Sequence, residues 1–320
     1  MIRVVDLEKA YDGRTALGPV SFEIERGETV GILGRNGSGK TTLLRILAGD
    51  LLPSAGSVWL DGIDAIRQPH EAHNRTGFLP EVPPIYDDMR VGDYLAFAAR
   101  LRGVPSAEVA ARVRAAEERT QIGEVRGTLI SHLSHGYRQR VGLAQAIVHE
   151  PPLLILDEPT HDLDPVQIVG MRNLVVGLKG RHTVLLSSHI LSEISETCDR
   201  LLVMSGGRIV ASGSEAELAG QLRQAHHLRV TVRPHGDGRE SAAEGVLACV
   251  RAVEGVETAA VTGEEEAALE VTVRARDDRR AEVCRALVTA GHDVLRLERA
   301  QRELEQVFLE LVGGGDGARA

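Results

Sequence analysis

Residues 29–51 contain the pattern that most limits how this chain can fold. The apolar stretch TVGIL is followed by the glycine-rich run GRNGSGKTT and then by apolar residues at helical spacing. A buried strand, a glycine-rich turn and a helix in this order present backbone N–H groups that bind phosphate. In this pattern Lys40 reaches the outer phosphates, and the Thr41 hydroxyl can ligate Mg²⁺. The sequence therefore predicts a nucleotide site on an α/β sheet.

The run LLILDEP at residues 153–159 predicts a second strand of this sheet. Its apolar residues would deliver Asp157 and Glu158 to the carboxyl end of the strand, where open α/β sheets bind ligands. Asp157 is suited to hold Mg²⁺, and Glu158 to take a proton from an attacking water. The alternative is a carboxylate pair that caps a helix. His189 ends another apolar strand, VLLSSH, and could reach the γ-phosphate, although a lone histidine there is more often structural.

A second anion site is predicted at the start of the helix in LSHGYRQRVGLAQA, residues 133–146. Ser134 is expected to be the N-cap, and Gly136 keeps side-chain bulk away from the first turn. The phosphate loop lies about a hundred residues earlier in the chain. Since one phosphate group does not need two distant cradles from one chain, the residues leave open which anion this helix binds.

Composition favours a soluble, globular chain of about two domains, since it has 320 residues, 43% hydrophobic and 26% charged. The net charge of −9 argues against a protein that neutralises nucleic-acid phosphates, so no nucleic-acid partner is expected. The odd number of cysteines fits free thiols in a reduced compartment. Because no apolar run approaches the ~20 residues of a membrane span, we expect no transmembrane segment.

Alternating strand and helix patterns predict an α/β domain over residues 1–216, with a helix-rich subdomain at about 82–151. Residues 217–320 show a different pattern, in which the order β-α-β-β-α-β is followed by a helix at 304–312. This order favours a small α+β domain of ferredoxin-like type. The terminal GGGDGARA is expected to be disordered.

With GRNGSGKTT, LSHGY, LLILDEP, HDLD and SSH in this order, residues 1–216 resemble the ATP-binding subunit of ABC transporters. Three further segments resemble sequences of the ABC-2 type, particularly of gliding-motility and multidrug-like export ATPases: GFLPE, SSHILSEISETCDR and LEQVFLEL. The resemblance implies a P-loop NTPase fold, ATP and Mg²⁺ as cofactors, and Lys40, Glu158 and His189 as catalytic residues. It assigns ATP contacts to an adenine-stacking aromatic and to the phosphate loop: Tyr11, Gly34, Arg35, Asn36, Gly37, Ser38, Gly39, Lys40, Thr41 and Thr42.

In this family the signature of one subunit faces the nucleotide held by the other subunit. The resemblance thus assigns these residues to a partner's ATP: Leu133, Ser134, His135, Gly136, Tyr137 and Asp164. His135 and Tyr137 depart from the commonest signature, LSGGQ, and His161 replaces a small residue. A helix N-terminus contributes only ~0.3–1 kcal/mol to a nearby charge, or ~2 when partly buried. The signature could therefore recognise only a γ-phosphate that the partner already holds.

Glu81 stands where most members of the family have glutamine, and the resemblance assigns it, with Thr41 and Asp157, to the magnesium site. Glutamate at this position can ligate a metal or orient water, but it adds negative charge beside the phosphates.

The resemblance implies a Mg²⁺-dependent ATPase that dimerises with a copy or a paralogue. It would drive an integral-membrane permease on a separate chain, with export favoured, from the cytoplasmic face of the cell membrane. The irregular, proline-rich segment at residues 83–89 is the expected permease contact. One alternative is a soluble ABC ATPase acting on ribosomes or DNA, which the single phosphate loop and the lack of long heptads disfavour. The other is a module whose ATP only controls assembly, which Glu158 and His189 disfavour.

Overall fold

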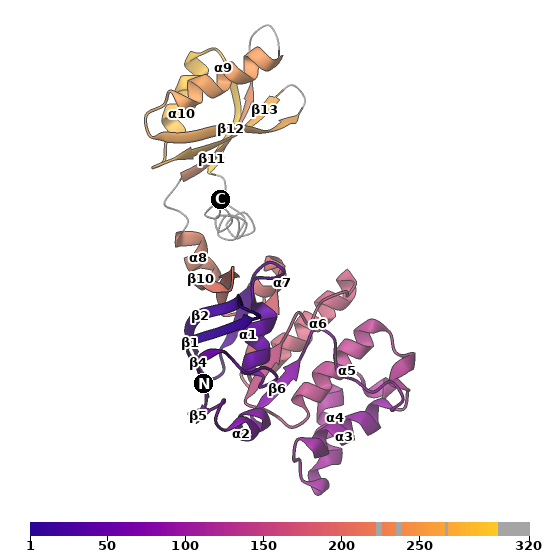
Figure 1. The fold of residues 1–320 in the computed structure, drawn as a ribbon. Helices are drawn as coiled ribbons and strands as arrows, with labels where there is room; N and C mark the ends of the chain where they lie inside the picture. Colours follow the sequence, from indigo (N-terminus) through magenta and orange to yellow (C-terminus); the bar gives the residue numbers. More distant parts are fainter. Residues whose placement is uncertain (222–225, 235–238, 266–267, 300–320) are drawn as a thin grey trace. The chain divides into compact units, whose positions relative to one another are not determined.

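The computed structural model describes residues 1–221, 226–234, 239–265 and 268–299, which form two units (Figure 1). The first unit comprises Met1–Glu215, and the second comprises the described residues from Ala216 onward. Within these described ranges, no helix combines the length and the apolar character needed to span a membrane.

A six-stranded sheet of order β10-β9-β3-β8-β7-β6 forms the centre of the first unit. Five of its strands are parallel, and β10 pairs antiparallel with β9 at one edge. The strands are β3 (Thr29–Leu33), β6 (Thr76–Leu79), β7 (Leu153–Leu156), β8 (Thr183–Ser188), β9 (Arg200–Ser205) and β10 (Arg208–Gly213). Every residue of β3, β6, β7 and β8 is buried, as expected for parallel strands that are covered on both faces.

A second, antiparallel sheet of order β2-β1-β4-β5 completes the strand structure of this unit. Its strands are β1 (Ile2–Tyr11), β2 (Arg14–Ile24), β4 (Ala55–Leu60) and β5 (Ile63–Asp64). One apolar core contains residues of both sheets and of α1 (Lys40–Leu47), among them Val4, Ile32 and Leu44. The helix that follows the phosphate loop is therefore fixed by packing against both sheets.

Helices connect the strands of the central sheet (Figure 1). They are α2 (Pro69–Asn74), α3 (Val91–Leu101), α4 (Ser106–Thr120), α5 (His135–Ile147), α6 (Pro165–Leu178) and α7 (Leu191–Ser195), with short 3-10 helices at Gly123–Val125 and Ile130–His132. The helix α8 (Glu215–Gln221) follows β10, where the first unit ends. The helical run from α3 to α5 lies between β6 and β7, in the region predicted from sequence to be helix-rich. A Cβ atom added to Gly77 on β6 would lie 2.1 Å from the carbonyl oxygen of Ala146 on α5, so these elements meet closely.

The second unit is an antiparallel sheet with two helices. Its elements are β11 (His226–Arg233), α9 (Arg239–Arg251), β12 (Val256–Glu265), β13 (Ala268–Ala275), α10 (Arg280–Thr289) and β14 (Asp293–Arg299). The sheet order is β12-β13-β11-β14, and Val230, Val250 and Leu287 share its core with other apolar residues. This is the predicted ferredoxin-like order β-α-β-β-α-β. The predicted helix at 304–312 and the predicted disordered tail lie outside the described residues.

The close approach of β6 and α5 predicts that Gly77→Ala destabilises the first unit. The added methyl group would overlap the Ala146 carbonyl, and overpacking of this kind costs about 1–3 kcal/mol. Urea unfolding should therefore show a lower midpoint. Gly123→Ala is the matched control because nothing lies within 4 Å of its added Cβ atom. Equal midpoints for the two variants would contradict this description of the packing.

Candidate nucleotide site

The phosphate loop connects β3 to α1 and requires glycine at two positions because a Cβ atom there would contact neighbouring atoms too closely. Gly39 has φ +100°, and a Cβ atom there would lie 2.8 Å from the Ala16 carbonyl oxygen. A Cβ atom on Gly34 would lie 2.4 Å from Ser38 Oγ. Gly39 is also the N-cap of α1 and provides no side-chain cap. The first N–H groups of α1 therefore have no side-chain acceptor at the cap, which suits a bound phosphate.

Ser38 gives a second indication that the loop fits phosphate. Its hydroxyl oxygen is buried and has no hydrogen-bond partner among the described residues. Buried polar atoms normally have such a partner, and a phosphate oxygen would supply one here. The loop residues predicted from sequence therefore form a cradle that is both tight and incompletely hydrogen-bonded.

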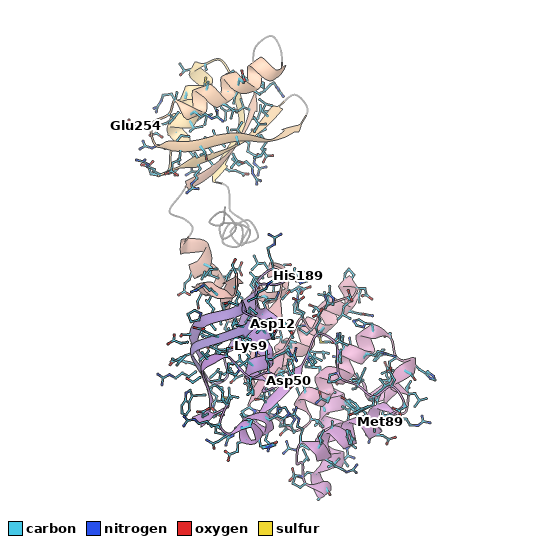
Figure 2. All side chains as sticks on the ribbon, viewed as in Figure 1. Lys9, Asp12, Asp50, Met89, His189 and Glu254 are labelled. Atoms are coloured by element: carbon cyan, nitrogen blue, oxygen red, sulfur yellow. The ribbon has the colours of Figure 1, made fainter. Side chains whose placement is uncertain are left out.

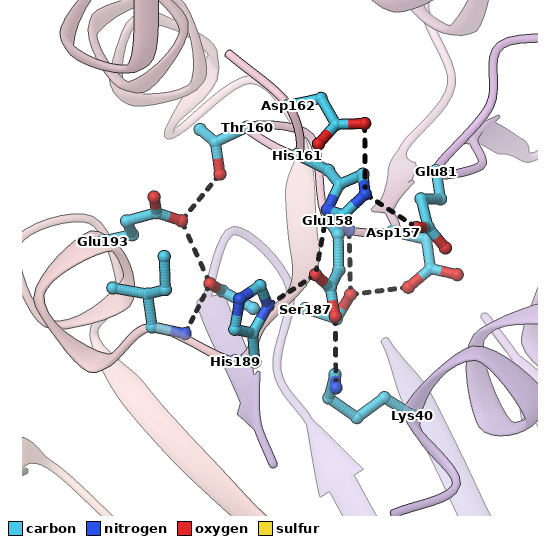
Figure 3. Close-up of polar contacts among 12 residues, drawn as sticks. Lys40, Glu81, Asp157, Glu158, Thr160, His161, Asp162, Ser187, His189 and Glu193 are labelled. Atoms are coloured by element: carbon cyan, nitrogen blue, oxygen red, sulfur yellow. Dashed lines mark hydrogen bonds and ion pairs between the residues drawn. The ribbon is translucent and has the colours of Figure 1, made fainter. Parts of the chain in front are cut away.

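Lys40 is the buried cation of the site, with only 4% of the residue exposed. Its Nζ atom donates to the carbonyl oxygens of Gly34 at 2.8 Å and Arg35 at 3.4 Å. It also lies 3.2 Å from Glu158 Oε1 (Figure 3). A buried charge is tolerated only when it is paired and hydrogen-bonded, so these contacts fix the loop against the end of β7.

Asp157 follows β7 and is 1% exposed. Ser187 on β8 donates its hydroxyl to Asp157 Oδ1 at 2.6 Å and accepts the Glu158 N–H at 2.9 Å. Burial raises the pKa of Asp157, while hydrogen bonds from Ser187 and Thr41 act in the opposite direction. Thr41 and Asp157 thus lie together, and their oxygens are ligands that Mg²⁺ prefers. Ser187 was not predicted, although it lies on β8 only two residues before His189, which directly follows that strand.

Glu158 lies between two positively polarised groups. Its Oε2 atom is 2.7 Å from Nδ1 of His189, and its Oε1 atom contacts Lys40. Burial alone would raise the pKa of Glu158, but the Lys40 charge and the hydrogen bonds from His189 and Lys40 lower it below 4.5. The carboxylate is therefore ionised at neutral pH and able to accept a proton. Glu158 also has φ +45°, a strained conformation for a residue with a side chain.

His161 joins the carboxylates around Glu158, a role that the sequence did not predict. Its Nε2 atom lies 3.3 Å from Glu81 Oε1 and 3.5 Å from Asp162 Oδ2, and its Nδ1 atom lies 3.9 Å from Glu158 Oε2 (Figure 3). Its carbonyl oxygen is 3.3 Å from His135 Nε2. His161 stands where the family that the chain resembles has a small residue, and Glu81 stands where most of its members have glutamine. These two residues therefore contact each other.

Two capped helices form the region assigned to the partner's ATP. Ser134 is the N-cap of α5, as predicted, and accepts the Tyr137 N–H at 3.4 Å. Asp164 is the N-cap of α6 and accepts the Gln167 N–H at 2.9 Å. A Cβ atom on Gly136 would lie 2.6 Å from Gln167 Oε1. A pocket of about 110 Å³ is lined here by Ser134, Gly136, Tyr137, Arg140, Leu163, Gln167 and Met171.

Tyr11 ends β1 and is 44% exposed. Lys9 Nζ lies 5.1 Å from the centre of its ring and donates to the Leu52 carbonyl oxygen at 2.9 Å. Figure 2 labels Lys9 and His189 in the same unit. A half-exposed ring held beside a cation is suited to stack on a base, which supports the predicted adenine contact as a proposal.

Comparison with known proteins identifies the family. The ABC transporter family model matches residues 17–161. ABC transporter ATP-binding protein NatA of Bacillus subtilis is 35% identical over 220 residues, which cover 67% of this chain and 89% of that protein. The chain belongs to the ABC transporter ATP-binding proteins. It is therefore an ABC ATPase that binds ATP with Mg²⁺ and has a P-loop NTPase fold.

Other relatives match to different extents. Bacitracin transport ATP-binding protein BcrA of Bacillus licheniformis is 29% identical over 327 residues, or 98% of each chain, so that match includes the second unit of this ABC ATPase. A solved ATP-binding subunit of an ABC transporter has a TM-score of 0.64 and 29% identity, covering 69% of this chain and 93% of that one. Clostridium perfringens cbiO1, described as part of the cbiONQ transporter complex, has a TM-score of 0.62 and 31% identity, covering 69% and 94%.

The contacts of Lys40 predict that Lys40→Met weakens ATP binding by about tenfold or more, because a hydrogen bond to a charged group contributes about 1.5–3 kcal/mol. Isothermal titration calorimetry of the purified chain with Mg²⁺-ATP measures this loss. Lys179→Met is the control, since Lys179 lies before β8 and pairs with Asp199 at 3.0 Å. An equal effect of both variants on ATP affinity would argue against a specific role for Lys40.

Proposed function

We propose that this ABC ATPase hydrolyses Mg²⁺-ATP at a site completed by a second ATPase subunit, and that hydrolysis drives export through an integral-membrane permease on another chain. One observation carries the two-subunit part. Among the described residues, no hydrogen bond or ion pair joins the signature at 133–137 to the phosphate loop at 34–42. The signature residues form their own pocket with α6 and remain available to another chain.

The residues of the site divide the chemistry of hydrolysis among them. Lys40 and the loop N–H groups hold the phosphates, and Tyr11 stacks on the adenine. Glu158 accepts a proton from the attacking water, and His189 keeps that carboxylate ionised and oriented through the contact at 2.7 Å. Thr41, Asp157 and Glu81 would hold Mg²⁺, which would supply positive charge beside the phosphate oxygens.

The signature would act in trans on a nucleotide that is already bound. Ser134, Gly136 and the first N–H groups of α5 provide hydrogen-bond donors and the positive end of a helix dipole. Leu133, His135, Tyr137 and Asp164 complete this surface as predicted partner contacts. The helix dipole alone contributes little binding free energy. The signature of the second subunit would therefore bind only to ATP that the first subunit already holds. ATP then closes the dimer, and hydrolysis releases it.

The permease contact is proposed at residues 83–89, which contain no helix or strand and begin two residues after Glu81. A hollow of about 460 Å³ lies beside this segment and is lined by residues that include Pro84, Tyr86, Phe97 and Leu101. Tyr86 is 53% exposed, and its ring lies 5.9 Å from the Phe97 ring in an edge-to-face arrangement. Arg102 also lines the hollow and supplies a positive charge there, so an apolar permease loop with an acidic residue would fit it. This contact would hold the ATPase at the cytoplasmic face of the cell membrane.

The role of Glu158 is tested by Glu158→Gln, which keeps the shape of the side chain but removes its basicity. We expect ATP binding to persist, kcat to fall by about 10²- to 10⁴-fold, and an ATP-bound dimer to accumulate. A phosphate-release assay and light-scattering mass measurements report these outcomes. Glu23→Gln is the control because Glu23 lies exposed on β2, where it forms an ion pair with Arg3 of β1. Unchanged turnover in Glu158→Gln would show that the base lies elsewhere.

The permease contact is tested by placing a photo-crosslinking phenylalanine derivative at Tyr86 and irradiating membranes from cells that express the chain. We expect a crosslink to an integral-membrane protein, because Tyr86 is exposed beside the hollow. The same derivative at Trp59, an exposed residue of β4, should not give this product. Crosslinks from position 86 only to the chain's own core would contradict the assignment.

A further inference from the structure

Glu193 on α7 accepts two hydroxyl groups with a single carboxylate oxygen. Thr160 Oγ1 donates to Glu193 Oε2 at 2.6 Å, and Ser188 Oγ donates to the same atom at 3.0 Å (Figure 3). Thr160 lies in the loop after β7, and Ser188 is the last residue of β8. Glu193 therefore connects the two loops that carry Glu158 and His189.

These contacts complete a closed ring around the candidate base. Thr160 follows Glu158 by two residues, and Ser188 directly precedes His189. The ring is closed by the contact of 2.7 Å between His189 Nδ1 and Glu158 Oε2. Two short stretches of backbone and three hydrogen bonds thus join the five side chains.

The helix that carries Glu193 is itself anchored to the phosphate-binding strand. Ile194 is fully buried, and its Cγ2 atom lies 2.5 Å from where a Cβ atom of Gly31 on β3 would be. Thr197 Oγ1 donates to the Glu193 carbonyl oxygen at 3.0 Å. Ser188 Oγ also accepts the Ile190 N–H at 2.9 Å, which fixes the turn after His189. Glu193, the acceptor in the ring, is therefore held in place by the packing of α7 against β3.

We propose that Glu193 is a positioning residue for ATP hydrolysis. It touches neither the nucleotide cradle nor the reacting atoms, and it acts by holding Thr160 and Ser188 so that His189 stays against Glu158. A carboxylate suits this role because two hydroxyl donors must share one acceptor, and hydrogen bonds to a charged acceptor are short and strong. The inference rests on the proposed role of Glu158 as the base.

The test compares two variants of similar length in the purified full chain. Glu193→Met removes the acceptor, whereas Glu193→Gln retains an amide oxygen that can accept both hydroxyls. Because small misplacements of reacting groups lower rates strongly, we expect kcat to fall about tenfold or more in the methionine variant and less than about threefold in the glutamine variant. KM for ATP should change by less than about twofold in both, since the phosphate loop is not altered.

A second pair of variants keeps the test decisive if Glu193→Met does not fold. Thr160→Val removes the hydroxyl while Thr160→Ser keeps it, so only the valine variant should lower kcat. If both residues act through one ring, the double variant Glu193→Met with Thr160→Val should lower kcat by a smaller factor than the product of the two separate decreases.

Equal kcat values within each pair, or a loss that appears in KM rather than kcat, would overturn the positioning role. Glu158→Gln separates this failure from failure of the proposed function. If Glu158→Gln stops turnover while Glu193→Met turns over at the wild-type rate, only the role of Glu193 is wrong.

Discussion

The buried ammonium group of Lys40 is the interaction on which the nucleotide site depends. A charge that is almost entirely removed from water must be compensated, and here two loop carbonyls and the Glu158 carboxylate do so. The same contact contributes to the lowered pKa of Glu158. Phosphate oxygens would compete with Glu158 for this ammonium group. ATP binding would therefore weaken the ion pair that holds Glu158, the proposed base.

The two proposed halves of the ATP site, the phosphate loop and the signature, differ in how they would bind phosphate. The phosphate loop relies on backbone conformation, with Gly34 and Gly39 allowing contacts that a Cβ atom would block. The signature relies on the N-cap Ser134 and on packing of Gly136 against Gln167 of α6. We expect the phosphate loop to hold a nucleotide alone, because the dipole of a single helix at the signature contributes too little binding free energy to do so. This difference is the physical reason to expect that ATP joins two subunits.

The parts of the site that depend on local sequence were predictable. Asp157, Glu158 and His189 directly follow buried strands, and Lys40 and Thr41 begin the helix after the glycine-rich loop. The strand ends of a parallel sheet meet at one edge. The N-cap role of Ser134 was predictable because capping involves residues only three positions apart.

Contacts between distant segments could not be predicted in this way. The His161 ion pair with Glu81 and the hydrogen bonds of Glu193 join residues whose proximity is set by the order of strands in the sheet. Strand patterns alone do not give that order. The same holds for β9 and β10, whose antiparallel pairing at the sheet edge had no distinct signal in the sequence.

The most direct test of the two-subunit site is to add Ser134→Arg to Glu158→Gln and measure ATP affinity and ATP-dependent mass in the same preparation. The arginine would fill the pocket that Ser134 lines at the start of α5, and the phosphate loop is not among the residues that line this pocket. The account predicts that the monomer keeps its ATP affinity to within about twofold, since the helix contributes little to binding alone, while the ATP-dependent dimer disappears. A loss of monomer affinity as large as that of Lys40→Met, or an unchanged dimer, would contradict it.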